Sequence, residues 1–538
     1  MAASKMIRGT LILTIASFVS RFLGIFFMIP YYWLTGLPGS NLYQYAYTPY
    51  AIMLSISTLG LPLAVSKFVS KYNALGDYES GRRLLKSGIV LMFLTGIVGF
   101  LILFLGAPKL AELNNISSRD FDHVVLVIRV VSIAIIIVPV MSLMRGYFQG
   151  FQSMGPTAVS QVVEQVVRVA FILVSSYIVM NVVHGSVVTA AALATFAAFV
   201  GAVGGLYVMM HYWVIRRRKI GDFERRNRII RRHKMPLLSM YKELVTYAVP
   251  FVAVGIAMNL YQLIDQPMTN HYLHYSYEVK QAVITDLTMN DQKLVMIPVV
   301  LATSLAVSAV PALIVSYAKG DFRGVNEKIT QAFQLVLFLT VPAAFGLSAL
   351  GYMVHGLLYG SRPELLLIGG RVLTWYAPTA LLFALFQVGA SILQGINRQM
   401  VTIVALGTGV LLKILTNPIC MKLFGMVGPI IATDLGYSCS FLIIALTIRR
   451  VTGFEFSMIA QQLVHIVCYT AMMLLAVNAI LLLFGGRVPT NRGLSLIIVI
   501  LCVVLGAAVY LLPAKWTGLL RKVMGTASHS GALREDRR

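Results

Sequence analysis

The sequence predicts an all-α integral membrane protein with fourteen transmembrane helices. Of its 538 residues, 58% are hydrophobic and only 12% are charged, and that charged share is about half the average for soluble domains. The mean hydropathy is +0.81. The apolar runs are long and continuous rather than alternating, which excludes a membrane β-barrel. Each run approaches the roughly 20 apolar residues that one spanning helix needs.

Fourteen apolar segments follow one another along the chain. The first lies behind Lys5 and Arg8 and has no small-residue cleavage site after it, so we interpret it as a retained span rather than a signal peptide. The spans are expected at 8–33, 44–70, 84–106, 123–149, 157–182, 187–215, 242–272, 284–317, 327–351, 368–394, 399–421, 427–449, 458–484 and 492–512.

The distribution of charge predicts the orientation of these spans. Lys and Arg total 44 against 20 Asp and Glu, a net charge of +24. With the N-terminus in the cytoplasm, the cytoplasmic segments receive most of the basic residues, as the positive-inside rule requires. An even number of spans then places both termini in the cytoplasm. The largest basic cluster, between Arg216 and Lys234, is interpreted as a contact with anionic lipid headgroups. It lacks interleaved aromatic residues, so we expect no nucleic-acid partner.

Repeated motifs indicate two related halves. Pro62-Leu-Ala-Val-Ser66 and Gly76-Asp-Tyr78 are echoed by Pro311-Ala-Leu-Ile-Val-Ser316 and Gly320-Asp-Phe322. Likewise, Gln149-Gly-Phe-Gln152 is echoed by Gln394-Gly-Ile-Asn397. Two six-helix repeats inserted in the same orientation would place a substrate cavity between them. The predicted organisation is a lobe at 1–215, a basic linker at 216–241, a second lobe at 242–450, two additional helices within 451–512 and a basic tail at 513–538.

Several chemistries have no motif in the chain. There is no phosphate-binding P-loop, HExxH or Cys-x-x-Cys sequence, so we expect neither ATP hydrolysis nor a metal or cofactor site. The acids of one external loop, Glu112, Asp120 and Asp122, could serve a glycosyltransferase but are better explained as solvated surface. The four cysteines lie in apolar stretches and are interpreted as packing residues: Cys420, Cys439, Cys468 and Cys502.

Two basic residues within spans are the main candidates for function, because charges inside a membrane are costly and usually serve a purpose. Arg21 lies about midway along the first span, which contains no acid to neutralise it. Lys293 lies early in the eighth span, five residues before Pro298. One cation from each half would give a cavity a positive field, so we expect an anionic ligand. Arginine suits phosphate because its planar fork can bind two oxygens.

Other charges within spans are secondary candidates with structural alternatives. Glu164 and Arg168 are four residues apart and are expected to pair on one helix face. Asp265 is a candidate for binding a coupling cation or for pairing with Lys293. Basic residues near span ends can extend to the interface instead. The remaining basic candidates are Arg129, which can also reach the interface, Lys413, which matches Arg168 at an offset of 245 residues, and the near-terminal Arg145 and Arg371.

Several of these segments resemble the MurJ-type lipid II flippases of the multidrug/oligosaccharidyl-lipid/polysaccharide exporter superfamily. The resemblance is narrowest to the Gram-positive branch, which includes the stage V sporulation protein B-like proteins. It covers nearly the whole chain and rests on Ser20-Arg21-Phe-Leu-Gly24, Ala64-Val-Ser-Lys67-Phe-Val-Ser-Lys71-Tyr, Gly76-Asp-Tyr78, Arg145-Gly-Tyr-Phe-Gln-Gly150, Met154-Gly-Pro-Thr-Ala-Val-Ser-Gln-Val-Val-Glu-Gln165 and Lys293-Leu-Val-Met-Ile-Pro298.

The resemblance implies a transporter of undecaprenyl-pyrophosphate-linked peptidoglycan precursor in the plasma membrane, and not an enzyme. It also implies that Arg21 and Lys293 line a central cavity. Other arginines found in the family are replaced here by Phe27 and by the region of Ser55 and Ser57, so the cationic site is sparser. Expected partners are the lipid-linked glycan, membrane lipids and cell-wall synthesis enzymes. The drive would be the membrane potential, a coupling cation or consumption of product outside. Alternatives are another polyprenyl-linked glycan, of capsule or spore cortex, and a multidrug exporter.

Overall fold

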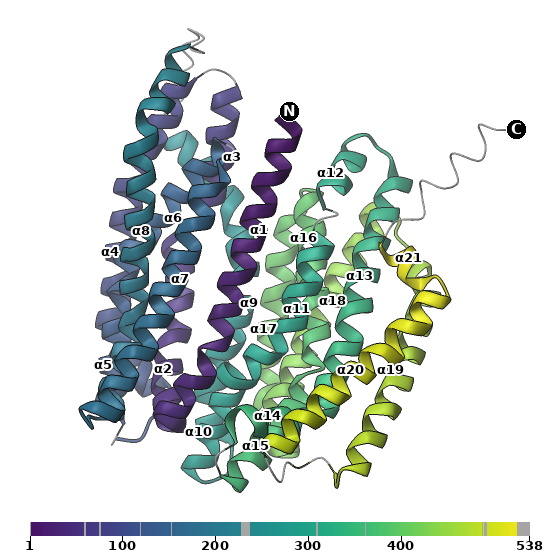
Figure 1. The fold of residues 1–538 in the computed structure, drawn as a ribbon. Helices are drawn as coiled ribbons and strands as arrows, with labels where there is room; N and C mark the ends of the chain where they lie inside the picture. The colour runs from purple at the N-terminus through teal and green to yellow at the C-terminus, as the bar shows by residue number, and fades with distance from the viewer. Residues whose placement is uncertain are drawn as a thin grey trace, which may run out of the picture. The chain divides into compact units, whose positions relative to one another are not determined.

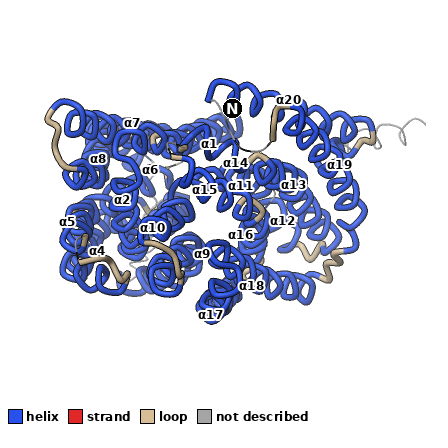
Figure 2. Tube along the Cα trace, turned by 90° about the horizontal axis from the view of Figure 1, so that it is seen from below, coloured by secondary structure: helices blue, strands red, loops and turns tan. Residues whose placement is uncertain are grey.

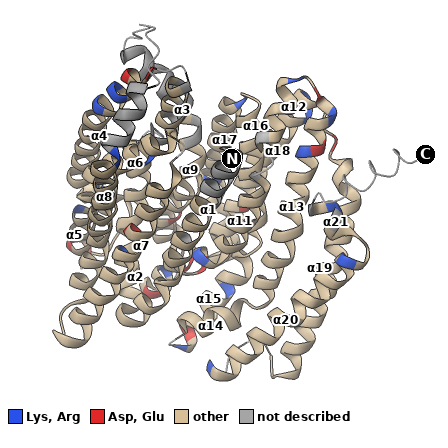
Figure 3. Cartoon of the chain, turned by 45° about the horizontal axis from the view of Figure 1, so that its top comes forward, with Lys and Arg blue, Asp and Glu red and all other residues tan. Residues whose placement is uncertain are grey.

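The computed structural model describes residues 2–58, 61–74, 77–118, 120–151, 153–226, 237–307, 310–360, 362–486, 488 and 492–524. Throughout these ranges, every regular element is a helix (Figure 2). Long stretches of the helices carry no charged residue (Figure 3). The all-α membrane fold expected from composition is therefore confirmed.

The chain divides into two compact units, Met1–Pro267 and Met268–Arg538. The first unit contains α1 (Ala2–Phe26), α2 (Met28–Thr58), α3 (Leu61–Ala74), α4 (Tyr78–Leu113), α5 (Phe121–Ser132), α6 (Ala134–Gly150), α7 (Met154–Tyr177), η1 (Ile178–Val182), α8 (Val187–Arg226) and most of α9 (Leu237–Tyr272) (Figure 1). The predicted second lobe begins earlier, at 242, and the predicted lobe boundaries stay a prediction.

The second unit begins within α9. It contains α10 (Tyr277–Thr285), η2 (Asp286–Asn290), α11 (Asp291–Val307), α12 (Val310–Ala318), α13 (Phe322–Ala349), α14 (Gly351–Tyr359), α15 (Pro363–Tyr376), α16 (Thr379–Gly395), α17 (Gln399–Phe424), η3 (Gly425–Val427), α18 (Gly428–Thr452), α19 (Ser457–Leu483), α20 (Arg492–Trp516) and α21 (Leu519–Met524).

Ten helical stretches in the described residues are long and apolar enough to cross a membrane. Two of them, Ile15–Thr58 and Gln399–Thr452, contain 44 and 54 residues. Since one crossing takes about 20 residues, each is long enough for two. The first of these is interrupted at Gly36, whose φ of 66° is non-helical and suits a residue without a side chain. The number fourteen stays a prediction.

The sequence echoes occupy equivalent places in the two units. Asp77 caps α4 by accepting a hydrogen bond from the Ser80 backbone N–H at 3.1 Å. Asp321 caps α13 by accepting one from Gly324 at 2.9 Å. The first unit packs α3 against α6 and the second packs α12 against α16. The repeated motifs therefore form the same local arrangement twice, a capped helix and a helix pair.

Glycines at the second echo allow both helix pairs to approach closely. A Cβ on Gly150, at the end of α6, would lie 2.6 Å from the Val69 Cβ of α3. A Cβ on Gly395, at the end of α16, would lie 3.1 Å from Val310 of α12. Neither position has room for a larger residue without some shift of its neighbours, and the constraint is tighter in the first unit.

The two C-terminal helices belong to the second unit. A buried cluster joins α19 and α20 to the start of α14, through residues that include Met353, Val477 and Ile498. The Tyr510 hydroxyl of α20 donates to the Phe338 carbonyl of α13 at 2.8 Å. These helices thus cover α13 and α14 rather than standing apart.

Candidate functional site

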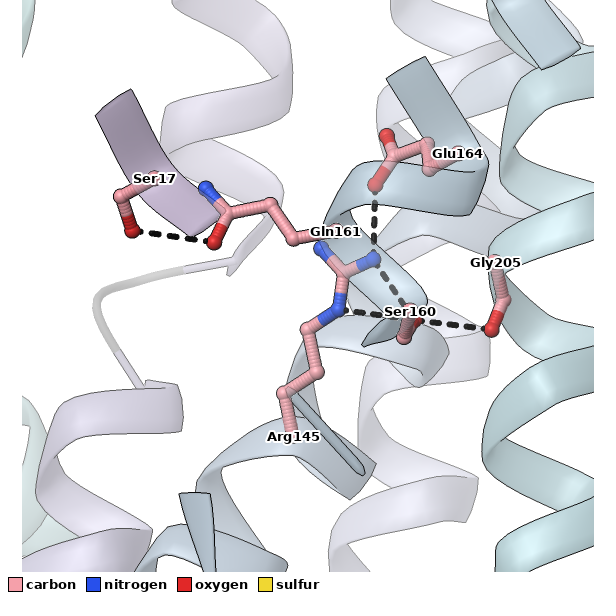
Figure 4. Close-up of polar contacts among 6 residues, drawn as sticks. All are labelled: Ser17, Arg145, Ser160, Gln161, Glu164 and Gly205. Carbon is pink, nitrogen blue, oxygen red and sulfur yellow. Dashed lines mark hydrogen bonds and ion pairs between the residues drawn. The ribbon is translucent and has the colours of Figure 1, made fainter. Parts of the chain in front are cut away.

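A polar network in the first unit is centred on Arg145 of α6 (Figure 4). Its guanidinium donates to Glu164 Oε2 at 2.8 Å and to Ser160 Oγ at 2.7 Å, both on α7. Ser160 in turn donates to the Gly205 carbonyl of α8 at 2.9 Å. The partly buried ion pair therefore joins α6 to α7, and the Ser160 hydrogen bond joins α7 to α8.

This network corrects two expectations. Glu164 pairs with Arg145, not with Arg168 four residues along its own helix. Arg145 was expected to extend to the membrane interface, but its side chain is only 14% exposed and points to α7. The expected pairing was wrong because it considered neighbours on one helix alone, whereas the packing of α6 on α7 brings in a partner nineteen residues away in sequence.

Arg168 is held by aromatic side chains. Its guanidinium donates to the Tyr43 hydroxyl at 3.2 Å and lies over the ring of Tyr47, 5.2 Å from the centroid. The two tyrosines stack on one face of α2, with centroids 5.5 Å apart. Among the described residues, no carboxylate forms an ion pair with Arg168. The cation is therefore stabilised by π electrons and a hydroxyl oxygen.

The first-span candidate, Arg21, lies in α1, but its side chain is outside the described residues. The helix that carries it packs along α7. Ser17 donates to Gln161 Oε1 at 3.1 Å (Figure 4), and a Cβ on Gly24 would lie 3.0 Å from Gln165. Residue 21 is four after Ser17 and three before Gly24, so its backbone position is on the α1 face that meets α7.

Lys293 and Asp265 lie in different units. Lys293 is partly buried on α11 of the second unit. Asp265 is buried on the part of α9 that belongs to the first unit. Both take part in polar interactions. Their expected pairing, and the expected meeting of Arg21 and Lys293 in one cavity, stay predictions.

Lys413 is fully buried within the second unit. Its ammonium donates to Thr433 Oγ1 of α18 at 2.6 Å. The next residue, Asp434, accepts a hydrogen bond from Thr379 Oγ1 of α16 at 2.6 Å. Lys413 and Arg168 match in the sequence repeat, yet Lys413 bonds to a threonine hydroxyl and Arg168 lies against tyrosine rings.

Arg129 has a local structural role in the first unit. Its guanidinium lies over the Phe104 ring of α4, 5.1 Å from the centroid. Its Nε donates to the Phe104 carbonyl at 3.4 Å. These contacts fasten α5 to α4. Arg129 as a secondary cavity residue remains a prediction.

A basic pocket of about 500 Å³ lies at the ends of α15 and α17. Its lining includes Tyr275, Arg371, Trp375 and Lys422. Arg371 was expected to reach the membrane interface. Its side chain is exposed and lines this pocket. Two cations beside two aromatic rings are suited to an anion or a sugar, although no sequence motif pointed to this combination.

A buried cluster that sequence reasoning missed consists of Asp286, Asp291 and His355 in the second unit. Potential ligand atoms of the three side chains all lie within 4.8 Å of one another. Both acids fall inside the predicted eighth span, where a charged residue is itself a sign of function. His355 had no such sign, because it was expected in the loop after the ninth span.

Comparison with known proteins identifies the family. The family described as "Polysaccharide biosynthesis protein" matches residues 6–316. The lipid II flippase MurJ of Bacillus subtilis (strain 168) is 41% identical over 535 residues, covering 97% of this chain and 97% of that protein. The chain belongs to the MurJ family of lipid II flippases. Members of the MurJ family are transporters, so the expectation of a non-enzymatic membrane protein is confirmed.

Two further comparisons also cover most of the chain. Stage V sporulation protein B of Bacillus subtilis (strain 168) is 25% identical over 467 residues, covering 84% of this chain and 85% of that protein. A solved lipid II flippase MurJ in an inward closed conformation superposes with a TM-score of 0.62 at 14% identity, covering 93% of this chain and 98% of that chain. This last likeness confirms the fold.

Proposed function

We propose that this protein moves lipid II, the undecaprenyl-pyrophosphate-linked peptidoglycan precursor, from the inner to the outer leaflet of the plasma membrane. The observation that carries the proposal is the 41% identity to a lipid II flippase along 97% of both chains. A pyrophosphate cannot cross about 30 Å of hydrocarbon unaided. The protein would provide a polar route for the headgroup while the lipid tail stays in the bilayer.

Arg21 and Lys293 are proposed to bind the pyrophosphate. Each lies on a helix of a different unit, and alternating access would open the site that they form first to one membrane face and then to the other. The network of Arg145 and Glu164 supports this assignment indirectly. Because Arg145 is already paired with the Glu164 carboxylate, it is less suited to binding the anionic substrate. Arg168, supported by tyrosines, is a secondary candidate.

Direction requires an energy source, and the chain has no P-loop. The proposed sources are the membrane potential and a coupling cation. Each elementary charge moved across 100 mV changes the free energy by about 2.3 kcal/mol, so a cationic site would respond to the potential. We also propose that both termini are cytoplasmic and that cell-wall synthesis enzymes use the delivered substrate.

A second candidate is the transport of another polyprenyl-linked glycan. It is favoured by the 25% identity to stage V sporulation protein B. The lower identity and coverage make it secondary to lipid II. Both candidates share the pyrophosphate, so the same two cations would serve either substrate.

The test is rescue of a bacterium from which the native lipid II flippases are depleted. The measured quantity is the fraction of lipid II that an external enzyme can cleave. The wild-type gene is expected to restore cleavage. Arg21→Ala and Lys293→Ala are each expected to reduce it tenfold or more, since a charge-assisted hydrogen bond contributes about 1.5–3 kcal/mol.

Matched controls use exposed residues of the same type. Lys109→Ala and Arg323→Ala remove side chains that are 77% and 90% exposed, and both variants should rescue fully. Amounts of inserted protein are compared by quantitative blotting. Full rescue by Arg21→Ala and Lys293→Ala would refute the proposed site. A correctly inserted wild-type protein that fails to rescue would refute lipid II as the substrate.

A further inference from the structure

The helix that carries Lys293 contains one π-helical turn. The stretch from Tyr277 to Val307 is formed by α10, η2 and α11 in direct succession. Within it, the Asp291 N–H bonds to the Asp286 carbonyl, five residues earlier. Single π turns inside α-helices are rare, and those that occur often lie at functional sites.

This turn brings two carboxylates together. In an α-helix, residues five apart are separated by about 140° around the axis, because each residue turns by about 100°. The wider π turn instead stacks residues i and i+5, here Asp286 and Asp291. Both side chains are buried, with Asp286 4% and Asp291 0% exposed. The local backbone thus creates a cluster that ordinary helical spacing would prevent.

A histidine completes the cluster from a second helix. The Nδ1 of His355, on α14, lies 2.8 Å from Asp291 Oδ1. The imidazole fits against the backbone of α15, where a Cβ on Gly369 would clash with its Cε1 and Nε2 atoms. The site therefore depends on a glycine that leaves space for the ring.

Two oxygen atoms at the cluster have no hydrogen-bond donor in the described part of the chain. Asn290 Nδ2 donates to Asp286 Oδ1 at 2.9 Å. Asp291 Oδ2 and Asn290 Oδ1 are buried, and neither has a hydrogen-bond partner among the described residues. An unpartnered carboxylate oxygen in a buried site is costly. Two carboxyl groups and one imidazole gathered in one buried place are ligand groups that transition-metal ions accept.

We propose that Asp286, Asp291 and His355 bind one divalent first-row transition-metal ion, such as Zn²⁺ or Mn²⁺. Their ligand atoms lie within 4.8 Å of one another, and metal bonds to imidazole nitrogen and carboxylate oxygen are about 2.0–2.2 Å long. Two atoms bonded to one ion at these lengths are at most about 4.4 Å apart, so a small closing shift of the side chains brings all three within reach of one ion. The imidazole favours a transition metal over Mg²⁺ or Ca²⁺, which prefer oxygen ligands.

The bound ion would hold the π turn in place, and with it Lys293, two residues beyond Asp291. Metal binding itself is independent of the substrate. Only the effect on Lys293 rests on the proposed function. The metal would thus have a positioning role in transport, without contacting the pyrophosphate.

The test measures metal binding by the purified full-length protein, prepared without a polyhistidine tag. After treatment with chelator, the protein is incubated with ZnCl₂ or MnCl₂ and desalted. Bound metal is then counted by mass spectrometry, and Tm is recorded with and without metal. About one equivalent and a metal-dependent rise in Tm are expected. Absence of both in the wild-type protein would overturn the proposal.

Variants locate the ion. Asp286→Asn, Asp291→Asn and His355→Gln are each expected to lower metal affinity at least tenfold. Gly369→Ala keeps all three ligands but displaces the ring, and an effect of about 10–100-fold is expected, as for other supporting residues. If a ligand variant fails to fold, the metal affinity of Gly369→Ala provides the test instead. The matched control is Glu278→Gln, an acid of the same helical stretch that is 59% exposed, and it should bind metal like the wild type.

Equal binding by the ligand variants and Glu278→Gln would also overturn the proposal. The flippase rescue assay is scored separately. Metal binding without rescue would refute the lipid II function and leave the site standing. Rescue without metal binding would refute the metal site and leave the lipid II function standing.

Discussion

Asp77 in the first unit and Asp321 in the second cap their helices with the same hydrogen bond, but the helices before these caps have different interiors. The first unit's α2 has no charged residue between Met28 and Thr58 and contains six tyrosines. The corresponding stretch of the second unit, α10 to α11, buries two aspartates beside a histidine. The two units thus share the caps and the close packing, while their polar interiors differ.

The difference extends to the matched cations. Arg168 lies against Tyr43 and Tyr47 of α2, and Lys413 bonds to a threonine hydroxyl of α18. Elements that fix the fold can be equivalent in the two units because capping and packing need only a few residue types. Interior polar residues need not be equivalent, because capping and close packing do not depend on them.

The largest expected effect comes from the interior ion pair of the first unit. Arg145→Ala leaves the largely buried Glu164 side chain without its cationic partner, so we expect a loss of about 3 kcal/mol in the free energy of unfolding. The control is Arg362→Ala in the second unit. Its pair with Glu278 has a similar distance of 2.9 Å, but the side chains are 70% and 59% exposed, and such surface pairs contribute about 0–1 kcal/mol. Denaturation in detergent measures both, and equal losses would contradict the burial argument.

A smaller effect compares the two close helix pairs. Gly150→Ala would place a methyl group 2.6 Å from Val69 Cβ and 3.0 Å from the Ser66 carbonyl oxygen. Overpacking of this kind costs about 1–3 kcal/mol. Gly395→Ala meets only side-chain atoms at 3.1 Å or more, so it should be the milder change. Thermal unfolding ranks the two variants, and the reverse order would show that the units do not pack as described.

The smallest effect tests whether the caps are equivalent. Asp77→Ala and Asp321→Ala each remove one side-chain acceptor from a helix N-terminus, and each should cost about 1 kcal/mol. Asp77→Asn and Asp321→Asn keep an acceptor oxygen and serve as controls. Clearly unequal losses in the two alanine variants would break the equivalence between the repeats.

Composition was enough to predict the membrane class and the helical fold, and the repeated motifs marked the places where the structure has matching helix caps. These features depend on residues close in sequence. The partner of Glu164 was predicted incorrectly because it lies on another helix. The cluster of Asp286, Asp291 and His355 was missed for a different reason: its two acids meet only if the helix departs from 3.6 residues per turn. Nothing in the local composition marks that departure, and His355 is 64 residues away from Asp291.

The π turn has a consequence for the evolution and engineering of this helix. A π turn adds one residue to the course of an α-helix, and an inserted residue rotates everything after it by about 100°. Lys293 follows the turn at Asp286–Asn290 and therefore inherits that rotation. Deleting a single residue from the turn would separate the two aspartates and redirect the lysine together. One change in chain length therefore controls two features of the helix, so neither can be shifted without the other.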